Sequence, residues 1–127
     1  MLKLKRVVPV CLLAIFIASC ASKIITNLTP TQLPRNATGQ YLVEMALDST
    51  QQTLRSGSIN PTVVVGFNPY PMRPTLRLAN RWEALVPVPA GQDSIMYRFK
   101  VDYEYNKFSA KPGQGSLMSD EYKLTIK

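Results

Sequence analysis

The chain has 127 residues and a mass of 14.2 kDa, with 46% hydrophobic and 18% charged residues, so one small globular domain is expected. Ten prolines and six glycines argue against a helical bundle, and the formal charge is +7. The sequence contains no histidine and only two cysteines, which excludes Ser-His and Cys-His catalytic pairs and zinc sites. We therefore expect a non-catalytic protein without a metal or cofactor.

The first nineteen residues have the layout of a secretory signal peptide. Three basic residues lie within positions 3–6, an apolar run follows over 7–17, and the small residues Ala18 and Ser19 end it. Eleven residues rise only about 17 Å as a helix, against roughly 30 Å of bilayer hydrocarbon, which disfavours a permanent transmembrane helix. We expect residues 1–19 to be cleaved from the mature protein.

The end of this segment, Ile17-Ala18-Ser19-Cys20, resembles the lipobox of bacterial lipoproteins: an aliphatic residue, two small residues and a cysteine. The resemblance implies that Cys20 receives a diacylglyceryl thioether, becomes the new N-terminus and is acylated on its amine, with palmitate among the fatty acids. Two or more acyl chains give a stable membrane anchor where one does not. Positions 21 and 22 contain no aspartate, a pattern that resembles retention in the bacterial outer membrane.

Removal of residues 1–19 leaves 12 Lys and Arg against 8 Asp and Glu, a charge of +4, with no run of like charge. A nucleic-acid-binding surface is therefore not expected. Cys11 leaves with the signal peptide and Cys20 takes the lipid, so the exported domain has no disulfide. We expect residues 20–40 to form a tether, an edge strand near 23–28 and a loop over 30–39, and residues 41–127 to form the folded domain.

From Tyr41 onward, hydrophobic residues recur with a period of two, which is typical of strands with one face on a core. The pattern predicts strands over residues 41–47, 62–67, 76–78, 82–88, 94–105 and 122–126, with a weak strand over 52–55. The segment 68–74 contains three prolines and is predicted to lie at a sheet edge or corner, because proline cannot donate to a ladder. Turns are expected at 80–81 and 90–93, and a long loop from Asn106 through Gly115.

The clearest strand is Ser94–Tyr105, in which the six odd-numbered residues from Ile95 to Tyr105 all fall on one apolar or aromatic face. About seven short strands with turns between them predict an all-β fold, a small antiparallel β-sandwich. The long strand and the final strand together resemble the closing hairpin of immunoglobulin-like and fibronectin-III-like domains. No Cys-Trp-Cys spacing is present, so a transthyretin-like or other sandwich topology stays open.

Two carboxylates have a spacing that could suit glycan hydrolysis. Asp102 and Glu104 share a strand face at about 6.8 Å along the strand, a spacing in the range of an inverting glycosidase pair. Their neighbours on the same face are Arg98 and Lys100, so charge pairing on a solvated face explains them more simply. We assign no catalytic residue.

Aromatic rings and sheet edges are the other candidates for binding. Tyr70 and Phe108 lie in predicted loops, where a ring is less easily buried, and Trp82 shares a parity with aliphatic neighbours. Unpaired backbone groups at a sheet edge can accept a strand from a partner. Either feature fits a binding surface.

The sequence thus favours a lipid-anchored, non-catalytic interaction or assembly domain of the bacterial cell envelope, held at the membrane through Cys20 and bound to an envelope protein. A carbohydrate-binding module that contacts envelope polysaccharide through Tyr70, Phe108 and Trp82 is the alternative. A glycan hydrolase is a weaker alternative.

Overall fold

The computed structural model describes residues 23–127, and in this part of the chain the alternating segments form two β-sheets that pack over one core. The four-stranded sheet has the order β1-β3-β7-β6, with bounds β1 Lys23–Asn27, β3 Gln40–Ser49, β7 Arg81–Pro87 and β6 Arg73–Pro74. The second sheet has six strands in the order β2-β10-β8-β4-β5, with β9 also paired to β8. Its bounds are β2 Gln32–Leu33, β4 Asn60–Val65, β5 Asn68–Pro71, β8 Ser94–Tyr105, β9 Gly113–Met118 and β10 Tyr122–Ile126. These two sheets confirm the predicted all-β sandwich.

Alternation places the core residues on the inner faces of the strands. The buried side chains come mainly from β3, β7, β8 and β10: Tyr41, Val43, Met45, Leu47, Ala84, Val86, Ile95, Tyr97, Phe99, Val101, Leu124 and Ile126. Tyr97 and Phe99 meet edge to face, with ring centroids 5.6 Å apart, and Tyr122 packs against both rings. The core predicted from the alternation over 41–47, 82–88 and 94–101 is confirmed.

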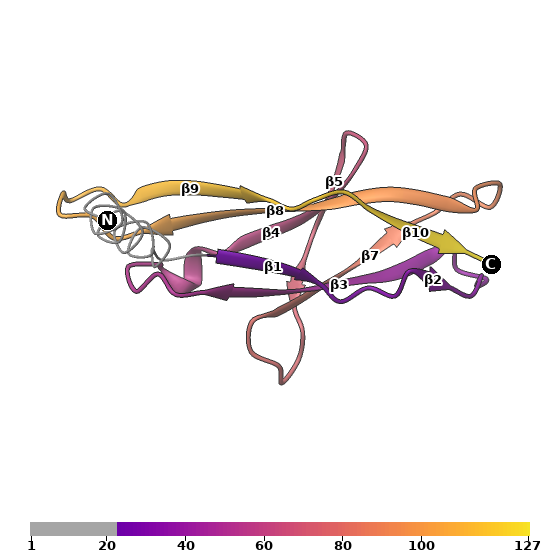
Figure 1. The fold of residues 1–127 in the computed structure, drawn as a ribbon, viewed down its shortest axis with the longest axis horizontal. Coiled ribbons are helices and arrows are strands. Elements are labelled where there is room, and N and C mark those ends of the chain that lie inside the picture. Colours follow the sequence, from indigo (N-terminus) through magenta and orange to yellow (C-terminus); the bar gives the residue numbers. More distant parts are fainter. Residues whose placement is uncertain (1–22) are drawn as a thin grey trace, which may run out of the picture.

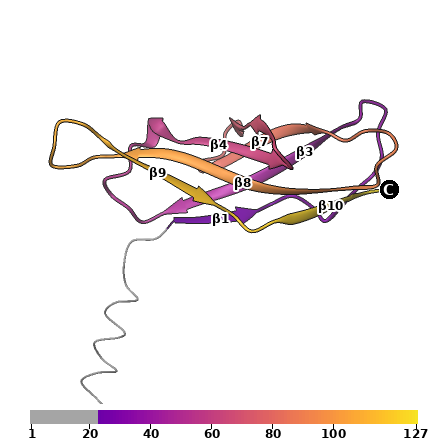
Figure 2. The ribbon, with the colours of Figure 1, turned by 90° about the horizontal axis from the view of Figure 1, so that it is seen from above.

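Strand β8 organises the six-stranded sheet and runs along nearly the whole length of the domain (Figures 1 and 2). It pairs with β4 on one side and with both β9 and β10 on the other. Lys100 is opposite Met118 and Tyr97 is opposite Tyr122, so three residues of the edge segment stand against two of β8. This extra residue is a β-bulge at 119–121, which makes β9 and β10 two halves of one interrupted strand.

The proline-rich segment lies at two edges, as predicted from its composition. Strand β5 is the outer strand of the six-stranded sheet, and β6 is the outer strand of the four-stranded sheet. Between them Met72 is buried in the core, so the chain changes sheets at this residue. The edge strand predicted near 23–28 is likewise found as β1.

Several local predictions were wrong. Residues 76–78 form no strand but a loop in which Leu76 is 87% exposed, because the Thr75 N–H donates to the Arg81 carbonyl and closes a tight turn with positive φ at Arg77 and Asn80. Of the weak strand over 52–55, only Leu54 forms a bridge, to Tyr105.

Strand boundaries also differ from the prediction. Strand β4 ends at Val65 instead of Phe67, because Gly66 adopts a positive φ of 62° and begins a turn. The predicted loop over 30–39 contains β2, which pairs in parallel with β10. The predicted loop 106–115 ends at Pro112, since β9 begins at Gly113. The described chain therefore has ten strands instead of about seven: the predicted strand 76–78 is absent, and β9 and the very short β2, β5 and β6 are added.

Candidate functional site

The free edge of β9 exposes backbone groups that no other strand satisfies. The Ser119 N–H donates to the Phe99 carbonyl at 2.9 Å, which marks this pair as hydrogen-bonded. Because hydrogen-bonded and non-hydrogen-bonded pairs alternate along an antiparallel ladder, Leu117, Gly115 and Gly113 also bond to β8. The N–H and C=O groups of Gln114, Ser116 and Met118 then point away from β8. Within residues 23–127 no strand pairs with this side of β9.

The edges formed by β5 and β6 are protected by proline. The Met72 N–H donates to the Pro61 carbonyl at 3.0 Å, so the same alternation places Pro69 and Pro71 at the outward-facing positions of β5. The Thr75 N–H bonds to the Arg81 carbonyl at 2.9 Å, which places Pro74 outward on β6. These prolines remove the donors that a partner strand would need.

Strands β1 and β2 differ from β9 as well. Strand β2 has only two residues, which is too short to template a ladder. Strand β1 begins with the charged residue Lys23, and the side chains of Lys23 and Asn27 contact residues of the opposite sheet. The Asn27 amide donates to the Tyr97 hydroxyl at 2.9 Å, and the Lys23 ammonium lies 4.5 Å from the centre of the Tyr103 ring. Among the described strands, β9 alone combines six residues, no charge and no proline at an open edge.

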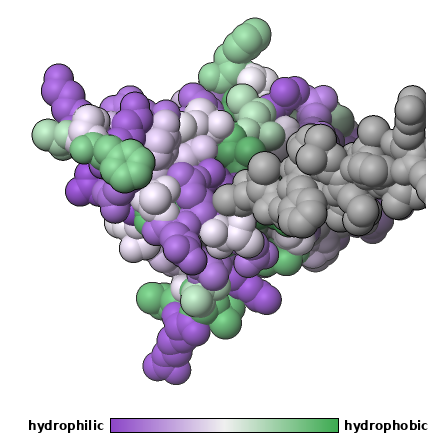
Figure 3. Space-filling model, turned by 60° about the vertical axis from the view of Figure 1, so that its left-hand side comes forward, coloured by the Kyte–Doolittle hydropathy of each residue, from purple (hydrophilic) through white to green (hydrophobic). Residues whose placement is uncertain are grey.

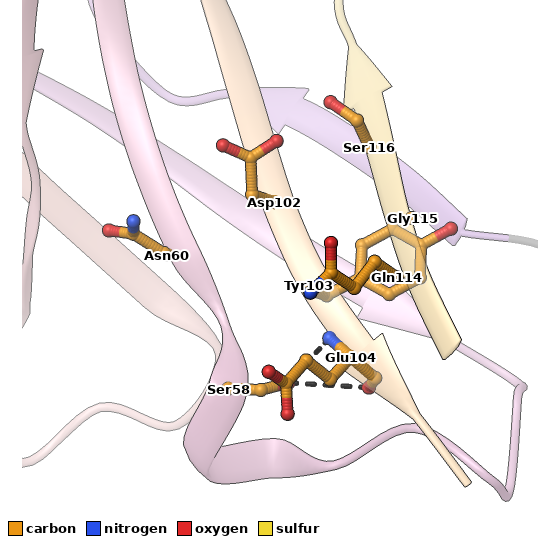
Figure 4. Close-up of a pocket in the computed structure, with 8 residues that line it drawn as sticks. All are labelled: Ser58, Asn60, Asp102, Tyr103, Glu104, Gln114, Gly115 and Ser116. Atoms are coloured by element: carbon orange, nitrogen blue, oxygen red, sulfur yellow. Dashed lines mark hydrogen bonds between the residues drawn. The ribbon is translucent and has the colours of Figure 1, made fainter. Parts of the chain in front are cut away.

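A shallow polar hollow of about 520 Å³ adjoins this edge on the outer face of the six-stranded sheet (Figure 4). Asn60, Asp102 and Ser116 form one row across β4, β8 and β9, since Asn60 is opposite Asp102 and Asp102 is opposite Ser116. Glu104 and Gln114 form the next row. Amide, carboxylate and hydroxyl groups in neighbouring rows can hydrogen-bond a polar ligand.

The two carboxylates of this hollow each contact a cation. Asp102 lies 3.8 Å from the Lys100 ammonium, and Glu104 lies 3.3 Å from the Arg55 guanidinium. Ser58, in the one-turn 3-10 helix η1 (Ser56–Ser58) that precedes β4, fixes this segment to β8, because its Oγ accepts a hydrogen bond from the Glu104 N–H at 2.8 Å (Figure 4). Both carboxylates are therefore paired with cations, as predicted, but Lys100 lies on the same strand as Asp102, and Arg98 pairs with Glu121 instead of with either of them.

The three aromatic candidates lie on separate elements and do not form one site. Tyr70 is not in a loop but in β5, opposite Val63, and packs against the core. Trp82 is half-buried on β7, opposite Met45. Phe108 lies in the β8–β9 loop, as predicted, and is fully exposed. The exposed apolar groups on the face seen in Figure 3 project at separate points instead of forming a continuous patch.

The four-stranded sheet has its own hollow, of about 480 Å³, between its outer face and the loop that carries β2. Leu42 and Leu85 face each other there across β3 and β7, and both are partly exposed. Pro30, Leu33 and Pro34 extend the apolar part of its lining. Arg35, Asn36, Gln40 and Glu44 also line this hollow, which is nearly as large as the polar one but more apolar.

Nowhere in residues 23–127 do three or more acidic, cysteine or histidine side chains gather in a way that suits a metal ion. The same part of the chain has no helix with the length and hydrophobicity needed to cross a bilayer. The predicted lipidation and cleavage residues, Ile17, Ala18, Ser19 and Cys20, lie outside the described residues.

The sequence pattern does not reveal the β9 edge, because Gly113 and Gly115 are typical of a loop. The signal that identifies the strand lies in its partner, β8. Tyr103 and Tyr105 continue the inward-facing alternation of β8, and two aromatic rings on this face need a neighbouring strand to pack against. Tyr103 is opposite Gly115 and Tyr105 is opposite Gly113. A Cβ on either glycine would overlap the ring across from it.

No family model and no curated protein matches the sequence. A solved structure of murine CRIg, an immunoglobulin-like domain, is similar to 82% of this chain and to 98% of its own chain, at 10% sequence identity and a TM-score of 0.47. At this identity the likeness concerns the arrangement of strands alone.

Proposed function

We propose that this chain is a lipid-anchored protein of the bacterial envelope whose β-sandwich acts as a non-catalytic interaction domain. It binds another protein by accepting a strand at the free edge of β9. The observation that carries the proposal is the contrast between edges: β5 and β6 place prolines at their outward positions, whereas β9 offers three outward residues, each with a backbone donor and acceptor that no strand of residues 23–127 satisfies.

Strand addition fits the chemistry of this edge. Main-chain hydrogen bonds supply the affinity, and side chains at alternate positions supply the specificity. Gln114, Ser116 and Met118 project onto the outer face beside the polar hollow, and Met118 is 52% exposed. A partner strand therefore gains six backbone hydrogen bonds and meets both polar and apolar side chains.

The lipid anchor supports a role at a membrane surface. Three peptide units separate Cys20 from Lys23, which span at most about 11 Å. Strand β1 therefore starts close to the lipidated residue, and the Lys23 ammonium contacts Tyr103, the residue opposite Gly115 of β9. Confinement to the membrane raises the effective concentration of a partner anchored in the same membrane.

The test compares Ser116→Pro with Ser116→Ala in native membranes, by crosslinking and mass spectrometry. The Ser116 N–H faces outward, so proline removes a donor from the edge and spares the ladder to β8, as Pro69 and Pro71 do on β5. Alanine keeps the N–H. We expect the proline variant to lose at least tenfold of the crosslinked protein partner and the alanine variant to retain it, with both variants folded by circular dichroism.

Equal crosslinking in the two variants would overturn strand addition at β9. Co-isolation of polysaccharide without a protein partner would favour the alternative, a carbohydrate-binding module. The polar hollow is the observation in favour of that alternative, since the row of Asn60, Asp102 and Ser116 can hydrogen-bond sugar hydroxyls. A hydrolase that uses Asp102 and Glu104 is the weakest of the three functions.

A further inference from the structure

We propose that the strand accepted by β9 is β9 of a second copy of this chain, so that two six-stranded sheets join across a twofold axis at Ser116. This inference rests on the proposed strand addition and names its partner. A twofold interface uses the same surface on both copies, so the β9 edge must be complementary to itself. The register, the charges and the position of the anchor each satisfy that requirement.

The backbone of β9 selects one register. In an antiparallel pair, a residue with outward-facing N–H and C=O groups must stand opposite another such residue. Only a twofold axis at Ser116 uses all three of them, by pairing Ser116 with itself and Gln114 with Met118 of the second copy. A shift of the axis by one residue toward Gly115 places Met118 opposite Pro112, which has no N–H.

The charges near β9 are self-complementary in this register. Residues 112–119 contain no charged side chain, so no like charges are brought together at the junction. Antiparallel pairing brings the flank that carries Lys111 of one copy toward the flank that carries Glu121 of the other, and symmetry repeats this approach. Glu121 already contacts Arg98 at 2.8 Å, and its side chain remains 46% exposed.

The side chains of the inner face also fit. Leu117 of one copy stands opposite Gly115 of the other, where no side chain projects from the backbone and the Tyr103 ring covers the glycine. On the outer face Met118 stands beside Gln114. On the inner face a glycine therefore opposes each leucine, so no bulky side chains from the two copies collide there.

Anchoring favours a second copy over any protein that is not held in the same membrane. Each copy begins β1 within about 11 Å of its lipidated cysteine, and Lys23 lies against Tyr103 on the same flank as β9. Two copies held in one membrane therefore meet at high effective concentration with their β9 edges near the surface.

The experiment places one cysteine at Ser116 in the full-length lipidated protein, co-expressed with two different tags, and oxidises the native membranes mildly. Residues directly opposite in a hydrogen-bonded pair have Cα atoms about 5.5 Å apart, within disulfide range. The matched control is Gln114→Cys, on the same face. In the proposed register its counterpart in the second copy lies about 14 Å away along the strand, too far for a bond.

We expect Ser116→Cys to form at least tenfold more covalent dimer carrying both tags than Gln114→Cys or the wild type. The wild type also accounts for any bond formed by Cys11 or Cys20. Co-expression of Gln114→Cys with Met118→Cys is expected to restore the dimer. Equal or absent dimer in Ser116→Cys and in the mixed pair would overturn the proposal.

Failure of this inference can be separated from failure of the proposed function. If no dimer forms, yet Ser116→Pro still abolishes crosslinking to a different protein, strand addition stands and the second copy is not the partner. If neither the dimer nor any proline-sensitive crosslink is found, both proposals fall.

Discussion

Tyr103 and Tyr105 lie over the two glycines of β9, and these contacts define how the strand attaches to the sheet. The ring of each tyrosine occupies the space that a side chain on the opposite glycine would fill. Such coverage of edge glycines by aromatic rings fixes strand register. Along β8, Val101 is the last residue that belongs to the hydrophobic core. Tyr103 and Tyr105 face the same side but pack over the backbone of the two glycines instead.

The replacement Gly115→Ala tests this contact. Its Cβ would overlap the Tyr103 ring, so we expect the free energy of unfolding to fall by about 1–3 kcal/mol, the usual cost of overpacking. Gly91→Ala is the control, because a Cβ there meets nothing within 4 Å. Urea titrations followed by fluorescence measure both. Equal stability of the two variants would show that the Tyr103 ring does not depend on Gly115.

Three sets of residues that are typical of loops occupy different places in the structure. Proline in 68–74 correctly predicted edges, because a missing N–H excludes an interior position for physical reasons. Glycine in 113–115 was misread, because glycine is compatible with both a turn and a strand covered by a large ring. Tyr70 was assigned to a loop since its neighbours are prolines, yet those prolines face outward and leave its own backbone free to pair with β4.

At the scale of elements, strands with strict alternation were predictable and short strands were not. The bounds of β8 match the predicted 94–105, because apolar and polar side chains alternate over its whole length and so indicate which face each residue occupies. Strand β2 pairs through only two residues, and its partner lies some ninety positions later in the chain. Leu76 and Leu78 are spaced like strand residues, but they lie in a loop and pair with no strand. Pairing between distant segments is therefore the information that alternation lacks.

The bulge between β9 and β10 gives a second stability prediction. The Ser119 Oγ accepts a hydrogen bond from the Phe99 N–H at 2.8 Å and donates to the Asp120 carbonyl at 2.8 Å. Ser119→Ala leaves the Phe99 N–H without its side-chain partner, and we expect a loss of about 1–3 kcal/mol in unfolding free energy. Thermal denaturation would show this as a lower melting temperature.

The control for this change is Ser116→Ala, since the Ser116 hydroxyl makes no hydrogen bond within residues 23–127. It is expected to alter stability by less than about 0.5 kcal/mol, as surface changes usually do. If both alanine variants melt together with the wild type, Ser119 does not hold the bulge.

In the whole molecule, the arrangement of the strands determines which end of the domain lies nearest the proposed lipid anchor. The sandwich has no disulfide among residues 23–127, where no cysteine occurs, and rests on one core shared by both sheets. The C-terminus lies at the opposite end of the domain from the β8–β9 loop (Figure 1). Strand β1, which follows the proposed lipidated residue most closely, starts near the end that carries β9.

The anchor itself is tested by Cys20→Ser. Because the thioether forms on the cysteine sulfur before cleavage in lipoproteins, we expect this variant to accumulate as an unprocessed precursor that takes up no lipid label. Cys11→Ser is the control, since Cys11 lies in the segment to be removed, and its mature mass should equal that of the wild type. A Cys20→Ser protein that is cleaved normally would contradict the lipoprotein assignment.

The central claim, that β9 accepts a strand, is tested most directly by hydrogen exchange at single amides of β9 in native membranes. The amides of Gly115 and Leu117 bond to β8 and provide the internal reference for slow exchange. We expect Gln114, Ser116 and Met118 to exchange as slowly as these two, because a partner strand accepts their N–H groups. Fast exchange at Gln114, Ser116 and Met118 beside slow exchange at Gly115 and Leu117 would show that the β9 edge is open and has no partner strand.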